Sequence, residues 1–160
     1  MGLVLSRSAM GRRAVAAFLG VALLSATFGA QPASAQRPPG PVALEALVKS
    51  TLLSFNDANV TGNYTVFHAK LAPPFREQFS PERLKAAFQS FSQQNIDFDI
   101  IAALKPILTE EPRIDGRGAL LVRGHFETSP NRVTFTLDYL QSEGDWKLIN
   151  IHVKVRPPGE

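Results

Sequence analysis

The sequence contains no cysteine and a single tryptophan, Trp146, among its 160 residues. The absence of cysteine excludes disulfides, thiolate metal sites, a cysteine nucleophile and a lipid-anchored cysteine. Three further patterns are missing: a glycine-rich phosphate loop, a G-x-S-x-G elbow and an H-E-x-x-H zinc motif. No short motif therefore assigns an enzyme class, and the length of the chain predicts one domain.

An excess of charge is also missing from most of the chain. The net charge is +3, but all 14 acidic residues lie at or after Glu45, whereas 3 of the 17 basic residues (Arg7, Arg12 and Arg13) lie near the N-terminus. The 14 basic residues that remain balance the 14 acidic ones over residues 36–160. Binding to nucleic acid needs a basic face on the folded part, so we expect no nucleic-acid partner.

The first 35 residues have the pattern of a secretory signal peptide. Three arginines precede an apolar run over residues 14–30, and Ala33-Ser34-Ala35 offers the small residues that a signal peptidase reads. We predict cleavage after Ala35, a periplasmic or secreted protein of bacterial type, and no membrane span after cleavage. An uncleaved anchor and twin-arginine export through Arg12-Arg13 are the alternatives.

Proline-rich segments bound the remaining domain. Residues 36–41 (QRPPGP) predict an extended tether, because proline fixes φ and lacks an amide donor. Residues 157–160 (PPGE) predict a short tail after the last strand. One folded domain is expected over residues 42–156.

Helical periodicity dominates the first half of this domain. Apolar residues at i, i+3, i+4 and i+7 predict a helix over Val42–Asn59. A second, short helix carries Tyr64 and His68 and is expected to end at Pro73-Pro74. A third begins at the N-cap Ser80 and ends near Asn95. Residues 96–103 suit either a strand or a loop that enters the sheet.

From Lys105 onward the apolar period changes to two. Four strands are predicted, over residues 106–114, 119–128, 132–141 and 146–156. The connections are too short for crossovers, so neighbouring strands should be antiparallel. The result is an α+β fold with two to three N-terminal helices packed on a four-stranded antiparallel sheet.

The two faces of the predicted sheet differ in polarity. The inward face is apolar and the outward face is polar, as in an antiparallel sheet with one side in water. The inward set is Leu120, Val122, Gly124, Phe126, Val133, Phe135, Leu137, Tyr139, Ile149, Ile151, Val153 and Val155; the outward set is Arg123, His125, Glu127, Thr134, Thr136, Asp138, Leu148, Asn150, His152 and Lys154.

The strand sequences carry a resemblance to a known family. They read GALLVRGHF (118–126), VTFTLDY (133–139) and GDWKLINI (144–151). Preceded by two or three helices, they resemble the nuclear transport factor 2-like superfamily, also called the cystatin-like or SnoaL-like fold, and the G-x-W-K-L pattern is similar to exported bacterial members of unknown function. The resemblance implies a curved, cone-like sheet whose apolar interior can hold a ligand. Many members insert a strand or hairpin before the third helix, and this sequence shows none.

Enzymes of that superfamily resemble ketosteroid isomerase or the polyketide cyclases, which place an acid or base inside the cone. Here no aspartate or glutamate falls on the inward face of the last three strands. The polar candidates for contact with a ligand are Tyr64, His68 and Tyr139. His68 can titrate near neutrality, but a half-buried histidine with one hydrogen bond is the alternative, and Tyr139 has the alternative of a hydrogen bond to the backbone.

The outward face offers a second candidate site. Arg123, His125, Asp138, Asn150 and His152 are the candidate interface for a homodimer or an envelope protein, with Arg123 and Asp138 expected to pair across strands. His125 and His152 lie on strands separated by a third, so their backbones should be about 10 Å apart. We therefore expect no metal site and no cofactor.

Three functions follow in order of preference. The first is an exported, non-catalytic module with a pocket for a small apolar ligand or a surface for a protein partner, in which no catalytic residue is assigned. The second is an isomerase- or cyclase-type enzyme that uses His68 with Tyr139 or Tyr64. The third is a purely structural domain associated with the envelope.

Overall fold

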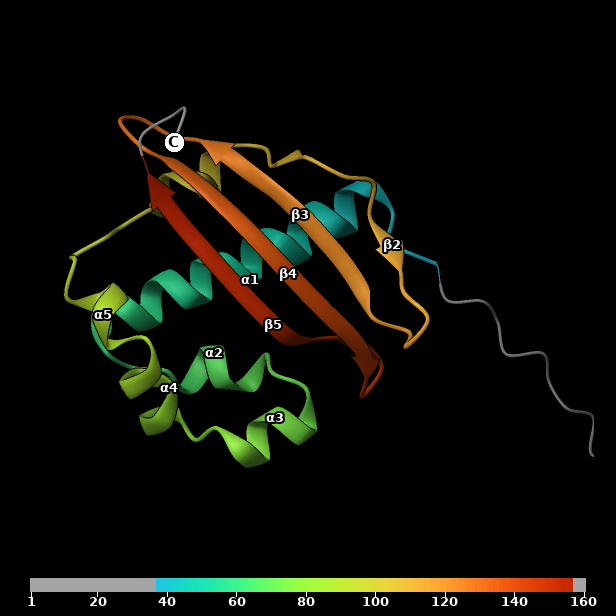
Figure 1. The fold of residues 1–160 in the computed structure, drawn as a ribbon, viewed down its shortest axis with the longest axis horizontal. Helices are drawn as coiled ribbons and strands as arrows, with labels where there is room; N and C mark the ends of the chain where they lie inside the picture. Colours follow the sequence, from blue (N-terminus) through green and yellow to red (C-terminus); the bar gives the residue numbers. More distant parts are fainter. Residues whose placement is uncertain (1–36, 157–160) are drawn as a thin grey trace, which may run out of the picture. The chain divides into compact units, whose positions relative to one another are not determined.

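The computed structural model describes residues 37–156, in which helices precede a curved antiparallel sheet (Figure 1). The coarse α+β class predicted from the sequence is therefore confirmed. The signal peptide, its cleavage site and the tail at 157–160 lie outside the described residues. Within residues 37–156, no helix is long and apolar enough to cross a membrane.

The first predicted helix is present as α1, Pro41–Thr61. Pro41 occupies its first turn, where a missing amide costs nothing. Gly62 ends it with a φ of 71°, a left-handed conformation that glycine adopts without a steric penalty. One face of α1 is buried in the core through Leu44, Val48, Thr51, Leu52 and Phe55.

Short helices follow α1, and they differ from the prediction in two respects. They are α2 Thr65–Ala69, α3 Pro73–Gln78, α4 Pro81–Ala87 and α5 Gln89–Ser92. Pro73-Pro74 does not merely end the second helix but forms the first turn of α3, because proline is tolerated at the first helical positions. The predicted third helix is broken at Phe88 into α4 and α5. Its predicted cap is present, since Ser80 Oγ accepts a hydrogen bond from the amide of Arg83 at 3.3 Å.

The ambiguous segment before the sheet forms a 3₁₀ helix, η1 Asp99–Ala103, and is not a strand. Its connection to α1 is a side-chain contact. Asn56 Nδ2 donates to Asp97 Oδ1 at 2.8 Å and to Asp99 Oδ1 at 2.6 Å, and Asn56 Oδ1 accepts from the amide of Phe98 at 3.1 Å. Hydrogen bonds to Asn56, a buried residue of α1, therefore hold the start of η1 in place.

Within residues 37–156 the sheet has five strands rather than four. The order is β1-β3-β4-β5, with β2 also paired to β3. The last three predicted strands are confirmed as β3 Leu120–Glu127, β4 Arg132–Ser142 and β5 Asp145–Arg156. The first predicted strand is divided into β1 Ile107–Leu108 and β2 Arg113–Ile114. Pro112 lies in the interruption and cannot donate to the ladder.

Gly124 lies on β3 at a point of close contact with β1. A Cβ built at this position would lie 2.6 Å from the Ile107 carbonyl oxygen and 2.8 Å from Phe135 Cζ. Only glycine allows β1 and Phe135 to pack where they do. The glycine inside the strand is thus explained by its neighbours rather than by its φ angle.

A β-bulge in β5 corrects the predicted division of the two faces. Tyr139 pairs with Leu148 and Asp138 pairs with Asn150, so Ile149 is the extra residue. Leu148 therefore lies on the helix-facing side with 1% of its surface exposed, and its predicted place on the outward face was wrong. Leu148 also pairs with the segment between α2 and α3, because its amide donates to the Lys70 carbonyl at 2.8 Å and its carbonyl accepts from the Ala72 amide at 2.9 Å.

The helices lie on one side of the sheet. Figure 1 shows α1 crossing behind β3, β4 and β5, with the short helices α2, α3, α4 and α5 gathered beside the β5 edge. The inward rows of β3 and β4 are buried against this layer, as predicted. The segment between α2 and α3 therefore meets the sheet at β5, through the bridge of Leu71 to Leu148.

Candidate functional site

The three residues predicted to contact a ligand each have a partner inside the fold. Tyr64 Oη donates to Asn59 Oδ1 at 2.7 Å, and Tyr139 Oη donates to Thr51 Oγ1 at 3.1 Å. Both tyrosines are 1% exposed. His68 is half-buried on α2, and its Nε2 lies 3.1 Å from the Arg76 carbonyl oxygen. This is the kind of single hydrogen bond named above as the alternative for His68.

Electrostatics also limit what these groups can do. Burial raises the pKa of Tyr139 far above its ordinary value, and burial likewise raises the pKa of Tyr64. Both phenols therefore stay protonated at neutral pH, and they are weaker acids than an exposed tyrosine. Tyr139 lines a cavity with Lys70 and Trp146 in which His68 takes no part. Tyr64 instead packs in an aromatic cluster, with its ring stacked 6.3 Å from that of Phe88.

The outward face of the sheet contains the predicted ion pair. Arg123 Nη1 lies 2.7 Å from Asp138 Oδ1, and Asn150 Nδ2 donates to Asp138 Oδ2 at 3.0 Å. His125 Nε2 contacts Glu127 Oε1 at 3.0 Å, whereas His152 is exposed and pairs in register with Thr136. Across residues 37–156 no group of three or more metal-ligating side chains is brought together. The use of this face as an interface stays a prediction.

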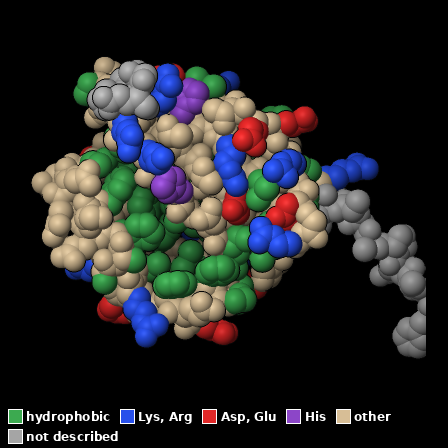
Figure 2. Space-filling model, in the orientation of Figure 1, with side chains coloured by type: hydrophobic (Ala, Val, Ile, Leu, Met, Phe, Trp, Pro, Cys, Tyr) green, Lys and Arg blue, Asp and Glu red, His purple; other side chains and the backbone are tan. Residues whose placement is uncertain are grey.

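An apolar groove lies between the short helices and β5, and we call it the aromatic groove. Its volume is about 220 Å³. Figure 2 shows hydrophobic side chains gathered in a hollow over the gap between β5 and these helices. The lining residues are Phe67, Leu71, Phe75, Phe79, Leu84, Ala87, Phe88, Leu148, Ile149, Asn150 and Ile151. Asn150 donates its side-chain amide to Asp138, and the groove is lined mainly by hydrocarbon and aromatic surface.

The groove depends on α3, which the sequence reasoning missed. Phe75 and Phe79 lie one turn apart, and their rings stack with centroids 6.5 Å apart at an interplanar angle of 11°. Phe79 is 40% exposed, an unusual position for a large aromatic residue in water. The signal that could have found α3 is the i, i+4 spacing of two aromatic residues directly after two prolines.

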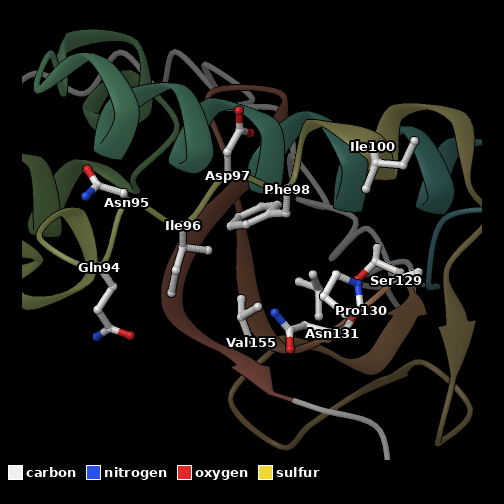
Figure 3. Close-up of a pocket in the computed structure, with 12 residues that line it drawn as sticks. Gln94, Asn95, Ile96, Asp97, Phe98, Ile100, Ser129, Pro130, Asn131 and Val155 are labelled. Atoms are coloured by element: carbon white, nitrogen blue, oxygen red, sulfur yellow. The ribbon is translucent and has the colours of Figure 1, made fainter.

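Further cavities lie elsewhere within residues 37–156, and two of these are larger than the aromatic groove. One of about 290 Å³ lies between the segment before η1 and the turn that joins β3 to β4, where Figure 3 shows Phe98, Pro130 and Val155 pointing toward one another. The other, of about 300 Å³, lies between α1, α2 and the β4–β5 hairpin, and we call it the Trp146 pocket. Its lining is Leu47, Ser50, Thr51, Val66, Ala69, Lys70, Tyr139, Asp145, Trp146 and Lys147.

The aromatic groove is the site with the simplest chemistry. None of its lining side chains titrates, so it offers neither an acid nor a base to a bound molecule. It can exclude water and present aromatic faces, which is the chemistry of apolar recognition. Comparison of the chain with protein-family models, with curated proteins and with solved structures finds no significant match.

Proposed function

We propose that this protein is an exported, non-catalytic module that binds a small apolar molecule in the aromatic groove. The observation that carries the proposal is the groove itself, a concave site with apolar and aromatic walls and no titratable side chain in its lining. Ligand sites in proteins are typically concave and mostly apolar, and a groove of about 220 Å³, below the roughly 300 Å³ of ordinary ligand pockets, suits only a small molecule. Membership of the nuclear transport factor 2-like superfamily, with a cone-like sheet and cleavage after Ala35, is part of the same proposal.

The rim of the groove gives a physical reason for binding. Phe79 exposes 40% of its surface, and its stacking partner Phe75 is only partly buried. Covering apolar surface is worth about 25 cal/mol per Å², so a ligand that covers 100 Å² of the groove gains about 2.5 kcal/mol from this side alone. An apolar molecule therefore has a favourable contact that water cannot provide.

The isomerase- or cyclase-type alternative has less support. Such an enzyme needs a proton-transfer group that faces the bound substrate. His68 is the nearest candidate along the chain, but it is bonded to the Arg76 carbonyl and does not line the groove. Tyr64 and Tyr139 stay protonated and donate to Asn59 and Thr51. The geometry favours binding without chemistry.

The test fills the groove from its rim without disturbing the core. Ala87 lines the groove and is exposed, whereas its neighbour Ala86 is also exposed on α4 but does not line it. The purified protein is titrated with N-phenyl-1-naphthylamine, a neutral apolar dye whose emission rises when it leaves water. We expect saturable binding by the wild type, a loss of about tenfold in affinity for Ala87→Phe, and no change for the matched control Ala86→Phe.

Two outcomes contradict the proposal. One is a dye signal that rises linearly without saturation in the wild type, which would favour the purely structural alternative. The other is equal weakening by both alanine variants, which would place the dye outside the groove. Circular dichroism of each variant establishes that the fold is retained, so that a loss of binding is not a loss of structure.

A further inference from the structure

The Trp146 pocket contains two lysines and too little negative charge to balance them. Lys147 Nζ lies 4.0 Å from Asp145 Oδ2, the limit of an ion pair, and the Lys147 side chain is 19% exposed against 70% for Asp145. Lys70 Nζ donates to Ser50 Oγ at 3.1 Å, and within residues 37–156 no carboxylate forms an ion pair with it. Two ammonium groups therefore share one loosely paired and largely exposed carboxylate.

The same imbalance of charge affects the pKa of Lys70. Burial lowers the pKa of Lys70, the nearby charge of Lys147 lowers it further, and only Asp145 acts in the opposite direction. A partly desolvated cation that forms no ion pair is in an unfavourable state, which an anionic ligand would relieve. The charge of the three groups sums to one positive unit, so a single negative charge completes the site.

The remaining lining of the pocket is suited to an apolar body. Trp146, the single tryptophan of the chain, presents an indole ring, and Leu47 and Val66 contribute aliphatic surface. Ser50 and Thr51 add hydroxyl groups beside the lysines. Small-ligand sites combine apolar surface with placed polar groups at volumes from roughly 300 Å³ upward, and here polar and apolar surface contribute about equally to the lining. The pocket, at about 300 Å³, is of that size.

We propose that the Trp146 pocket binds a small molecule that carries a carboxylate on a planar, apolar body. The carboxylate would lie between Lys70 and Lys147, and the body would lie against Trp146. This site shares no lining residue with the aromatic groove, so a test of one site does not test the other.

Trp146 makes the test direct, because all tryptophan emission of the protein comes from the pocket. The purified protein is titrated with 4-nitrobenzoate, an anionic aromatic quencher, and with 4-nitrobenzamide, a neutral molecule of nearly the same shape. We expect saturable quenching by 4-nitrobenzoate and linear, collisional quenching by 4-nitrobenzamide.

Variants then show whether Lys70 and Lys147 bind the carboxylate. Lys70→Gln and Lys147→Gln should each raise the apparent Kd for 4-nitrobenzoate about tenfold, since a charge-assisted hydrogen bond is lost. Lys154→Gln is the matched control, because Lys154 lies on the same strand with its side chain exposed on the outward face. Linear quenching by 4-nitrobenzoate, equal affinity for 4-nitrobenzamide, or equal weakening by Lys154→Gln would overturn the proposal. Thermal unfolding of each variant establishes that the protein tested is folded.

Discussion

Replacement of Asn56 should separate the effect of a lost hydrogen bond from that of an added charge. Asn56 is 1% exposed on α1 and makes three contacts to the segment before η1: two donated to Asp97 and Asp99, and one accepted from the amide of Phe98. Asp97 and Asp99 are exposed and can exchange the lost donor for water, whereas Phe98 is 2% exposed and its amide cannot. The amide of Phe98 therefore dominates the cost of a truncation.

For Asn56→Ala we expect a loss of about 2 kcal/mol in the free energy of unfolding. Most of this loss comes from the buried Phe98 amide, which is left unpaired, and the rest comes from the hydrogen bonds to Asp97 and Asp99. Asn56→Asp retains an acceptor for Phe98 but places a third carboxylate against two others at a buried position. An uncompensated buried charge costs about 3–5 kcal/mol, so the isosteric variant should be the less stable one at pH 7. Asn150→Asp, at an exposed amide that also faces a carboxylate, is the control and should cost less than about 1 kcal/mol.

The pH dependence follows from Asp97. The amide of Asn56, followed by the backbone amide of Asp99, lowers the pKa of Asp97 below its ordinary value of 3.8. A lowered pKa in the folded state means that this stabilisation is present above pH 3.8 and is lost as the pH falls through the folded value. The gap between wild type and Asn56→Ala should therefore narrow at acidic pH. The difference in the free energy of unfolding between wild type and Asn56→Asp should narrow further at acidic pH, because the new carboxylate becomes protonated.

Urea unfolding at pH 7 and at pH 3, followed by Trp146 emission and by circular dichroism, measures these gaps. An Asn56→Asp variant as stable as Asn56→Ala at pH 7 would refute the reasoning, since it would mean that the three carboxylates do not approach one another. A gap that is unchanged at pH 3 would show that the hydrogen bonds to Asp97 contribute nothing to stability.

Two further changes test the core. Tyr139→Phe and Thr51→Val should each cost about 1 kcal/mol, because each variant leaves the other buried hydroxyl without its partner, and the double variant should cost less than the sum of the two. Thermal unfolding measures these losses, and additive losses would argue that the two hydroxyls do not pair. Gly124→Ala should cost about 1–3 kcal/mol, because its Cβ would meet Ile107 O and Phe135; a fully tolerated alanine in the same assay would show that β1 can move away.

Sequence periodicity predicted the elements that are long and regular. The α1 helix and strands β3, β4 and β5 each repeat their apolar period over eight or more residues, so one irregular position does not hide the pattern. The bulge at Ile149 could not be seen in this way. Leu148, Ile149 and Asn150 fit a strand in either register, and the hydrogen bonds of Leu148 to the segment between α2 and α3 favour the observed one.

The candidate sites were harder to predict, for a related reason. His68 and the two tyrosines stand out in the sequence because polar groups on an apolar stripe are conspicuous, and the fold pairs each of them with a neighbour. Lys70, in contrast, looks like an ordinary surface cation. Its role in the Trp146 pocket depends on Ser50 and Lys147, which lie 20 and 77 positions away along the chain and meet it only after folding.

The segmentation of the helices explains where the aromatic groove lies. Helices of four to seven residues are marginal by themselves, so α2, α3, α4 and α5 must be held by tertiary contacts. Phe67 and Leu84 are buried and provide such anchors, while Phe75 and Phe79 remain at the rim. A single long helix over this region would lay one continuous apolar stripe on β5 and close the space. The prolines that start α3 and α4 prevent this, and the unfilled volume beside β5 is the consequence.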